Sequence, residues 1–303
     1  MTDHKPLISL ITVNYNGLDL TCALLESLKA NVSEDIETIV VDNGSKNDEA
    51  EEIRKRYPEV NAIRSERNLG FAGGNNLGAE AATGDYLFFI NNDTEILDNN
   101  ILALTDAFTR NPEAGIVCPK IRFWDGERRI QFAGYTPMKG IAMKNDLVGF
   151  NCIDDGTFDK AAESPFAHGA AMMVSRKAFE DVGPMPECYF LYFEELDWSN
   201  MFTRKGWKIL YEPSFTVFHK ESATTGRESP LRSYYMQRNR QLFARRNYSG
   251  AMRLMVILYA RYLSGGKRIL KALKDGRTDL VKAIIKGNID FLKIKKVEYA
   301  ENN

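Results

Sequence analysis

Residues 86–95 read Tyr86-Leu87-Phe88-Phe89-Ile90-Asn91-Asn92-Asp93-Thr94-Glu95, a run of five apolar and aromatic residues that stops at three small polar ones. The run is short enough for a β-strand and apolar enough to be buried on both faces, as strands of a parallel sheet are. In open α/β sheets, ligands bind outside the carboxyl ends of the strands. We therefore predict a buried strand that presents Asn91 and Asp93 to a ligand at one edge of a sheet.

The residues before this strand repeat the same pattern. Strands are predicted at 7–13, 37–41 and 60–64, and helices at 18–29 and 48–57. The first two strands end on polar, glycine-containing turns at 14–17 and 42–45. Alternating strands and helices are typical of a parallel sheet built from right-handed crossovers. The two turns and the one at 91–94 should therefore meet at the same edge of the sheet.

The second half of the chain has weaker signals. Strands are predicted at 115–118, 167–175, 207–211 and 215–219, and helices at 100–110, 176–182 and 195–204. Residues 120–165 are read as irregular strands and loops that cover the sheet, and 222–230 as a mobile loop. Residues 231–247 are predicted to be helical, and the tail to hold two amphipathic helices broken near Gly265-Gly266 and Asp275-Gly276. We predict an α/β domain at 1–230 and a basic helical extension at 231–303.

Charge is distributed unevenly along the chain. The formal net charge is −1, which predicts no nucleic-acid partner, but residues 251–303 hold 12 Lys and Arg against 5 Asp and Glu, a net +7. Such a tail fits the anionic inner surface of a membrane, the packing of a homodimer, or a solvated helical face. No secretory leader or apolar run of about 20 residues is seen, and the four cysteines are widely spaced. We expect a cytoplasmic protein with reduced thiols, peripheral to the membrane if the tail docks there.

A glycine-rich stretch at residues 66–78 has glycines at 70, 73, 74 and 78. These do not match the dinucleotide fingerprint, which needs G-x-G-x-x-G directly after the first strand, nor a P-loop. Two interpretations are open. The glycines either allow a tight turn and close helix packing, or they let a ligand approach the backbone, with Arg67 near a phosphate.

Three carboxylates, Glu194, Glu195 and Asp197, follow the aromatic stretch 189–193. An acidic helix start is favoured by the helix dipole. A carboxylate against aromatic walls is also partly desolvated, which raises its pKa toward that of a general base. For Asp93 and its neighbouring amides, the alternatives are an Asx turn and a Mg²⁺ site completed by a diphosphate.

Together, these stretches resemble the family 2 glycosyltransferases, which are inverting enzymes of the GT-A fold, and in particular the rhamnosyltransferase-like branch that builds bacterial cell-surface polysaccharide. The resemblance extends in order across residues 7–220. Its seven stretches are Thr12-Val13-Asn14-Tyr15-Asn16, Val41-Asp42-Asn43-Gly44-Ser45, Arg67-Asn68-Leu69-Gly70-Phe71-Ala72-Gly73-Gly74-Asn75-Asn76, Asn91-Asn92-Asp93-Thr94, Gly169-Ala170-Ala171-Met172, Tyr192-Phe193-Glu194-Glu195-Leu196-Asp197 and Val217-Phe218-His219.

The resemblance implies a mixed, mostly parallel central sheet flanked by helices. It also implies transfer of a sugar from a nucleoside-diphosphate sugar, such as dTDP-rhamnose or a UDP-sugar, to a saccharide or lipid-linked acceptor. The residues implied at the donor are Tyr15, Asn16, Asp42, Arg67, Gly70, Asn92 and Asp93. Those implied at Mg²⁺ or Mn²⁺ are Asp93, His219 and Asn91, and those on the acceptor side are Asp197 and Trp198.

The resemblance further implies that Glu195 is the catalytic base, with Glu194 as its rival. Two positions depart from the family pattern. Asn91 replaces the first Asp of the metal-binding D-x-D motif, which lowers the charge of the site. Glu195 is one methylene longer than the Asp found in the family at that position.

Three other functions are compatible with parts of the sequence. A sugar nucleotidyltransferase needs a basic, glycine-rich loop after the first strand, and residues 14–17 hold no Lys or Arg. A glycosidase would use two carboxylates, but the nucleotide-type turns would then have no role. A non-catalytic sugar-nucleotide-binding protein would keep those turns, and measuring nucleotide release separates it from an enzyme.

Overall fold

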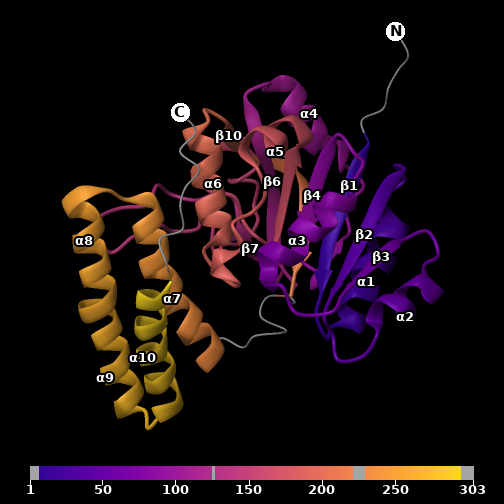
Figure 1. Cartoon of the computed structure of the whole chain (residues 1–303). Coiled ribbons are helices and arrows are strands. Elements are labelled where there is room, and N and C mark those ends of the chain that lie inside the picture. Colours follow the sequence, from indigo (N-terminus) through magenta and orange to yellow (C-terminus); the bar gives the residue numbers. More distant parts are fainter. Residues whose placement is uncertain (1–6, 125–126, 221–228, 295–303) are drawn as a thin grey trace.

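The computed structural model describes residues 7–124, 127–220 and 229–294 (Figure 1). A ten-stranded mixed sheet forms the centre, with the strand order β3-β2-β1-β4-β9-β6-β10-β5, β7 beside β6 and β8 beside β10. Helices cover the sheet, and the C-terminal helices form a bundle on one side of it (Figure 1). The predicted α/β class is confirmed.

The first half of the chain builds the parallel part of the sheet. Its elements are β1 (Ile8–Asn14), α1 (Leu18–Asn31), β2 (Ile36–Asn43), α2 (Glu49–Arg56), β3 (Asn61–Ser65), α3 (Gly70–Ala81), β4 (Tyr86–Ile90), β5 (Thr94–Ile96) and α4 (Leu102–Arg110). β1 pairs in parallel with β2 and β4, and β2 with β3. Asn14 lies opposite Asp42 in the register, so the first two polar turns do meet at one edge of the sheet.

The second half adds antiparallel strands. Its elements are β6 (Ala114–Phe123), β7 (Ile130–Phe132), β8 (Ala162–Glu163), β9 (Ala171–Ser175), α5 (Arg176–Val182), η1 (Glu187–Tyr189), α6 (Glu194–Arg204) and β10 (Lys208–His219). β9 runs antiparallel to both β4 and β6, whereas β10 runs parallel to β6. The chain therefore forms a mixed sheet.

Two strand predictions need correction. The predicted strands at 207–211 and 215–219 are one strand, β10, whose register against β6 shifts between Glu212 and Thr216. Pro213 lies inside that shift, where its missing N–H costs no ladder bond. β9 begins at Ala171 instead of residue 167, because the amide of Ala171 donates to the carbonyl of His168 in a turn.

The C-terminal helices are α7 (Pro230–Asn247), α8 (Gly250–Leu258), the π-helical η2 (Tyr259–Ser264), α9 (Gly265–Lys274) and α10 (Thr278–Lys293). The break predicted at Gly265-Gly266 is wrong, because the helix continues from α8 through η2 into α9. A Cβ at Gly265 would lie 2.9 Å from Nε2 of Gln237, so this glycine lets η2 and α9 approach α7. The break near Asp275-Gly276 is confirmed, and Gly276 has φ +69°.

The helical extension shares a hydrophobic core with the segment before α6. Tyr189 and Phe193 from that segment pack with buried side chains of the bundle, namely Leu242, Phe243, Ala244, Val256 and Phe291. The division predicted at residue 230 separates sheet from helices, but this core joins the two parts. Most of the predicted 222–230 loop lies outside the described residues. No helix in the described ranges is long and apolar enough to span a bilayer.

Candidate active site

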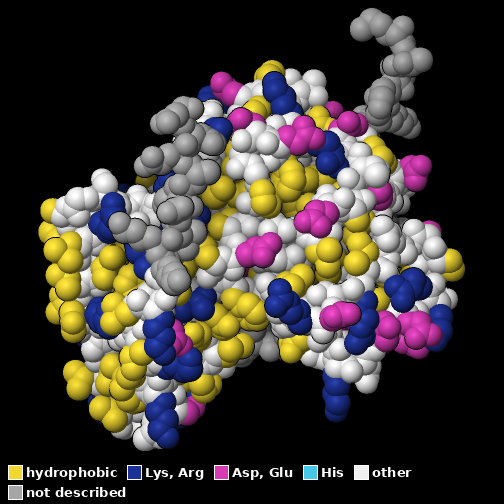
Figure 2. Space-filling model, in the orientation of Figure 1, with side chains coloured by type: hydrophobic (Ala, Val, Ile, Leu, Met, Phe, Trp, Pro, Cys, Tyr) yellow, Lys and Arg dark blue, Asp and Glu magenta, His cyan; other side chains and the backbone are white. Residues whose placement is uncertain are grey.

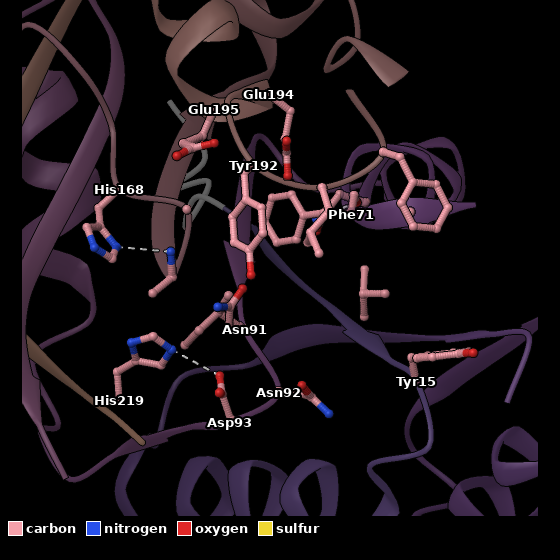
Figure 3. A pocket seen from close by; sticks show the side chains of 18 of the residues that line it. Tyr15, Phe71, Asn91, Asn92, Asp93, His168, Tyr192, Glu194, Glu195 and His219 are labelled. Atoms are coloured by element: carbon pink, nitrogen blue, oxygen red, sulfur yellow. Dashed lines mark hydrogen bonds and ion pairs between the residues drawn. The ribbon is translucent and has the colours of Figure 1, made fainter. Parts of the chain in front are cut away.

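A cavity of about 480 Å³ opens at the edge of the sheet where β1, β2 and β4 end (Figure 3). The turn between β4 and β5 supplies Asn91, Asn92 and Asp93 to its wall. The opposite wall comes from the start of α6, and further walls come from α3, β7, the segment before β9, and the first turn of α7. The polar side chains that follow β4 therefore do line a cavity, as the sequence predicted.

Asp93 and His219 form a pair at one side of the cavity (Figure 3). Oδ1 of Asp93 lies 3.1 Å from Nε2 of His219, and both side chains are almost fully buried. On the other side of the ring, Nδ1 of His219 lies 2.8 Å from Oε1 of Gln131 on β7. Because a carboxamide oxygen accepts the proton of Nδ1, a neutral His219 presents the lone pair of Nε2 toward Asp93.

Asn91 does not join this pair. Its side chain is turned toward Tyr192, whereas Asp93 is turned toward His219 (Figure 3). The backbone carbonyl of Asn91 accepts hydrogen bonds from the amide and the hydroxyl of Thr94, which closes a β-turn between β4 and β5. Asn92 lines the cavity and donates to Oγ1 of Thr21 at 3.1 Å.

Glu194 and Glu195 enter the cavity from the start of α6, on the side away from the Asp93–His219 pair (Figure 3). Burial, followed by the charge of Glu195, raises the pKa of Glu194 to about 8. Burial raises the pKa of Glu195 to about 7. Glu194 is 2% exposed and one of its carboxylate oxygens has no hydrogen-bond partner. The two adjacent carboxyls therefore bind protons more tightly than free glutamic acid and titrate as a pair, so protons can be exchanged here near neutral pH.

The backbone just before these glutamates is strained. Phe190, Tyr192 and Phe193 have φ of 67°, 70° and 80°, a left-handed region that aromatic residues rarely adopt. Asn239 of α7 holds this segment, because its Nδ2 donates to the carbonyls of Tyr189, Leu191 and Tyr192 at 3.0, 2.7 and 2.9 Å. The guanidinium of Arg238 also donates to the carbonyl of Tyr189. The helical extension thus fixes the chain that leads into Glu194 and Glu195.

Gly70 supports the same segment from α3. It has φ +77°, and a Cβ there would lie 2.4 Å from the carbonyl oxygen of Phe190. The amide of Phe71 donates to that oxygen at 2.7 Å. The glycines at 74 and 78 face side chains of β1, Val13 and Ile11. Gly74 and Gly78 therefore allow close packing against β1, whereas Gly70 both packs against Phe190 and lines the cavity.

His168 is a site residue that the sequence analysis did not single out. It lines the cavity between Tyr135 and His219, and its Nδ1 accepts the amide proton of Ala170 at 3.1 Å. Burial, with a smaller contribution from His219, lowers its pKa to about 3. His168 is therefore neutral and carries its proton on Nε2. Only its place before Gly169 hinted at a role, and a lone histidine is a weak signal.

Eight of the predicted site residues are brought together by the fold. Tyr15, Gly70, Asn91, Asn92, Asp93, Glu194, Glu195 and His219 all line the cavity. Tyr15 is 41% exposed, so its ring is accessible at the rim. These residues come from separate parts of the chain that meet because the strands end at one edge.

Asp42 and Asn16 were predicted at the donor, but neither side chain lines the cavity. Asp42 is fully buried, and its oxygens accept the amides of Ser45 and Glu49 and pair with Arg64 at 3.1 Å. Asn16 has φ 51°, and its Oδ1 accepts the amide of Lys46 at 2.9 Å. Asn16 therefore joins the turn after β1 to the turn after β2, whereas Asp42 holds its own turn to the start of α2 and to β3.

Arg67 is also displaced from its predicted place. Its side chain is exposed and does not line the cavity, whereas Arg232 does. Arg232 is in the first turn of α7, and its guanidinium lies 5.8 Å from the ring centre of Tyr192. No pattern around residue 232 marked it, because its position depends on how α7 packs against the sheet domain.

Neither of the predicted acceptor-side residues, Asp197 and Trp198, lines the cavity. Asp197 is fully buried, forms an ion pair with Arg246 of α7 and accepts Nδ2 of Asn247 at 2.7 Å. Trp198 is fully buried against Phe89 and donates to the carbonyl of Gly183 at 3.0 Å. Residues three or four positions after Glu194 should share its face of α6, but Glu194 and Glu195 are the two residues of α6 that line the cavity.

The chain is similar to known proteins over most of its length. The sequence model described as "Glycosyl transferase family 2" matches residues 9–183. An N-acetylglucosaminyl-diphospho-decaprenol L-rhamnosyltransferase of Mycobacterium tuberculosis (strain ATCC 25618 / H37Rv) is 27% identical over 82% of this chain and 87% of that protein. The low-salt glycan biosynthesis hexosyltransferase Agl10 of Haloferax volcanii is 24% identical over 92% of this chain and 89% of that protein.

Two solved structures share the fold. The mannosyltransferase PcManGT of Pyrobaculum calidifontis, in complex with GDP-Man and Mn²⁺, superposes with a TM-score of 0.59 and 14% identity over 96% of this chain and 88% of that one. GalNAc-T7 with UDP, GalNAc and Mn²⁺ superposes with a TM-score of 0.61 and 17% identity. The match covers 93% of this chain and 55% of that one. Because the family's sequence model matches more than half of the 303 residues and includes three of the polar stretches around the cavity, the chain belongs to the family 2 glycosyltransferases and has their GT-A fold.

Proposed function

We propose that this glycosyltransferase moves a hexose, with inversion, from a nucleoside-diphosphate sugar to a saccharide or lipid-linked acceptor in the synthesis of a surface glycan. The observation that carries the proposal is the arrangement across one cavity. Asp93 and His219 line one side, and the carboxyl pair Glu194–Glu195 lines the other (Figure 3). A leaving group held on one side and a base on the other suit a single displacement.

The Asp93–His219 pair fits a divalent ion. Two neighbouring ligands of an octahedral ion, each about 2.1 Å from it, are about 3.0 Å apart, and Oδ1 of Asp93 is 3.1 Å from Nε2 of His219. Gln131 orients the ring so that the unprotonated nitrogen faces the carboxylate. No group of three or more His, Cys, Asp or Glu side chains suited to a metal occurs among the described residues. Two protein ligands leave room for diphosphate oxygens, and a bound Mg²⁺ or Mn²⁺ would stabilise the charge of the leaving diphosphate.

Asp93→Asn should lower transfer by roughly 100-fold or more, because it removes the charged ligand. It should also raise the Mn²⁺ concentration needed for half-maximal activity. Nucleotide release, measured over a Mn²⁺ titration after treatment with a chelator, checks both effects. Glu95→Gln is a matched control, since Glu95 lies two residues away, pairs with Lys220 and does not line the cavity. Full activity of Asp93→Asn in chelator would rule out the metal role.

The proton chemistry is assigned to Glu195. Its carboxylate takes the proton of an acceptor hydroxyl, whose oxygen attacks the anomeric carbon from the face opposite the diphosphate. The new carbon–oxygen bond forms as the bond to the diphosphate breaks, and that electron pair leaves with the diphosphate. Glu194 stays protonated beside it, so the cavity wall holds one negative charge instead of two.

The pH dependence tests this division between the two glutamates. Because Glu195 must be deprotonated to act as a base and its pKa is raised to about 7, kcat/KM should fall as the pH drops through 7. We call this fall of kcat/KM at low pH the acidic limb of the profile. Glu194→Gln should keep the acidic limb and most of the activity, because Gln resembles the protonated form of Glu194. An acidic limb near pH 4.5, or its loss in Glu194→Gln, would contradict the assignment.

For the donor, we infer that Tyr15 faces the base and that Arg232, together with the metal pair, faces the diphosphate. Arg232 takes the place given to Arg67 in the sequence-based prediction, because it is the one arginine that lines the cavity among the described residues. The relative from Mycobacterium tuberculosis is named a rhamnosyltransferase, which supports dTDP-rhamnose as the first donor to test, with UDP-sugars next.

Release of free nucleotide from a panel of donors, with and without Mn²⁺ and acceptor, tests the proposal as a whole. Acceptor-dependent release supports transfer. Binding of donor without any release would favour a non-catalytic sugar-nucleotide-binding protein. Formation of a sugar nucleotide from nucleoside triphosphate would favour a nucleotidyltransferase, against which the turn after β1 argues because it holds no Lys or Arg.

A further inference from the structure

The C-terminal bundle exposes an unusual amount of apolar surface. Eighteen large hydrophobic side chains are exposed among the described residues, and eleven of them lie within residues 250–294. Tyr262, Leu270 and Leu292 are 66%, 68% and 64% exposed. Figure 2 shows hydrophobic side chains along the outer edge of the bundle, with Lys and Arg side chains beside them. A contiguous exposed apolar patch of this kind marks an interaction surface.

The exposed hydrophobic residues alternate with lysines in a helical pattern. On α10, Ile285, Ile289 and Leu292 recur at i, i+4 and i+7, and Lys282 and Lys286 each precede one of them by three residues. Residues three or four apart are neighbours on a helix surface.

α9 repeats the pattern. Leu270 lies between Lys267 and Lys274, three and four residues away, and Leu273 lies beside Lys274. All of these lysines and leucines are exposed. We call the exposed residues of α8, η2, α9 and α10 the basic apolar face.

The helices that carry this face are connected to the cavity wall through α7. Leu231, in the first turn of α7, lines the cavity and is 49% exposed. Two residues later, the carbonyl of Ser233 accepts a hydrogen bond from Arg268 of α9. α9 therefore contacts the first turn of α7, which contributes Leu231 and Arg232 to the cavity wall.

We propose that the basic apolar face docks on the surface of an anionic lipid bilayer and that the acceptor is a lipid-linked saccharide presented at that surface. This rests on the proposed function. Leucine and isoleucine would enter the boundary of the acyl chains, while lysines pair with anionic headgroups, as in helices that lie in a membrane interface. A second copy of the chain is the poorer occupant, because the cores of protein interfaces are depleted in lysine and a two-fold contact would oppose like charges.

The proposal is tested by flotation of the full-length protein with vesicles of phosphatidylcholine, with or without about 30% phosphatidylglycerol. The protein should float only with the anionic vesicles. The charge-reversal variant K267E/K271E/K274E should bind them roughly 100-fold more weakly, because each lysine near the surface contributes about fivefold to binding. L270S/L273S should also bind more weakly, which separates apolar insertion from charge alone.

The matched control is K29E/K55E/K177E, which reverses three exposed lysines on helices of the sheet domain and should float like the natural protein. All variants should keep their helical content and bind donor, so loss of docking is distinguishable from failure of the proposed function. Failure to float, equal flotation on neutral vesicles, or equal loss in the control would overturn the proposal. A dimer that only K267E/K271E/K274E dissociates would assign the face to a second copy and overturn it as well.

Discussion

Glu195→Gln should lower the rate of sugar transfer by about 10²–10⁴-fold, which is the usual contribution of a general base, while donor binding changes little. Gln has the shape of the protonated acid but accepts no proton. The change leaves the Asp93–His219 pair untouched on the other side of the cavity (Figure 3). Single-turnover transfer and a separate donor-binding titration would measure the two effects.

Glu194→Gln is the matched control for this variant, because the two residues are adjacent, line the same cavity and are similarly desolvated. It should keep activity within about tenfold, since Glu194 is already neutral near pH 7. Glu195→Asp should retain part of the activity, because the family uses Asp at this position. Near-normal turnover of Glu195→Gln would mean that Glu195 is not the base, and loss in Glu194→Gln alone would transfer the role to Glu194.

The sheet could be predicted because its signals are local. Buried strands such as residues 86–90 are continuous apolar runs, and each ends at a polar turn. Chain order and right-handed crossovers then bring the turns at 14–17, 42–45 and 91–94 to one edge. Tyr15, Asn91, Asn92 and Asp93 reach the cavity through that arrangement, whereas Gly70, Glu194, Glu195 and His219 were expected there because of the resemblance to the family. It was harder to predict that residues 208–219 form one strand, β10, because the irregularity at Pro213 looks like a turn in the sequence.

The errors at the site come from contacts between distant segments. Asp42 follows a strand as Asp93 nearly does, yet Arg64 and the first amides of α2 enclose it. Asp197 is an acidic residue next to Glu195, but Arg246, 49 residues later, draws it into the interface with α7. A sequence pattern states which groups can bind a ligand. Whether these groups already form hydrogen bonds or ion pairs within the protein depends on contacts between distant segments, which a local sequence pattern does not show.

Asn239 shows how far the helical extension enters the site. The family's sequence model matches residues 9–183, so Asn239 lies beyond it, and Arg238-Asn239 is only a loose match to the family in the sequence. In the structure, its one amide group donates to three carbonyls of a segment whose φ values are unfavourable for aromatic residues. Each such residue costs of order 1–3 kcal/mol, so the segment keeps this shape only while its partners hold it.

Asn239→Ala should therefore lower kcat by roughly 100-fold, because a carboxylate displaced by about 1 Å loses that much. Donor affinity should change little, since Asp93, His219 and Tyr15 are attached to other elements. If the segment relaxes, water reaches Glu195 and its pKa falls from about 7 toward its ordinary value. The acidic limb of the pH–rate profile should then move to lower pH, an effect that a general loss of stability does not produce.

Gln241→Ala is the control that separates positioning from folding. Gln241 is on the same helix, is fully buried, and donates to the carbonyl of Gln237 and to Oδ1 of Asn288, with no hydrogen bond to segment 190–193. Each variant leaves buried polar groups unpaired, so both should lower the free energy of unfolding by about 1–3 kcal/mol. Only Asn239→Ala should move the acidic limb. If the two variants lose stability and kcat in step and keep the limb near pH 7, Asn239 is a structural residue, and the strain before α6 is held by other contacts.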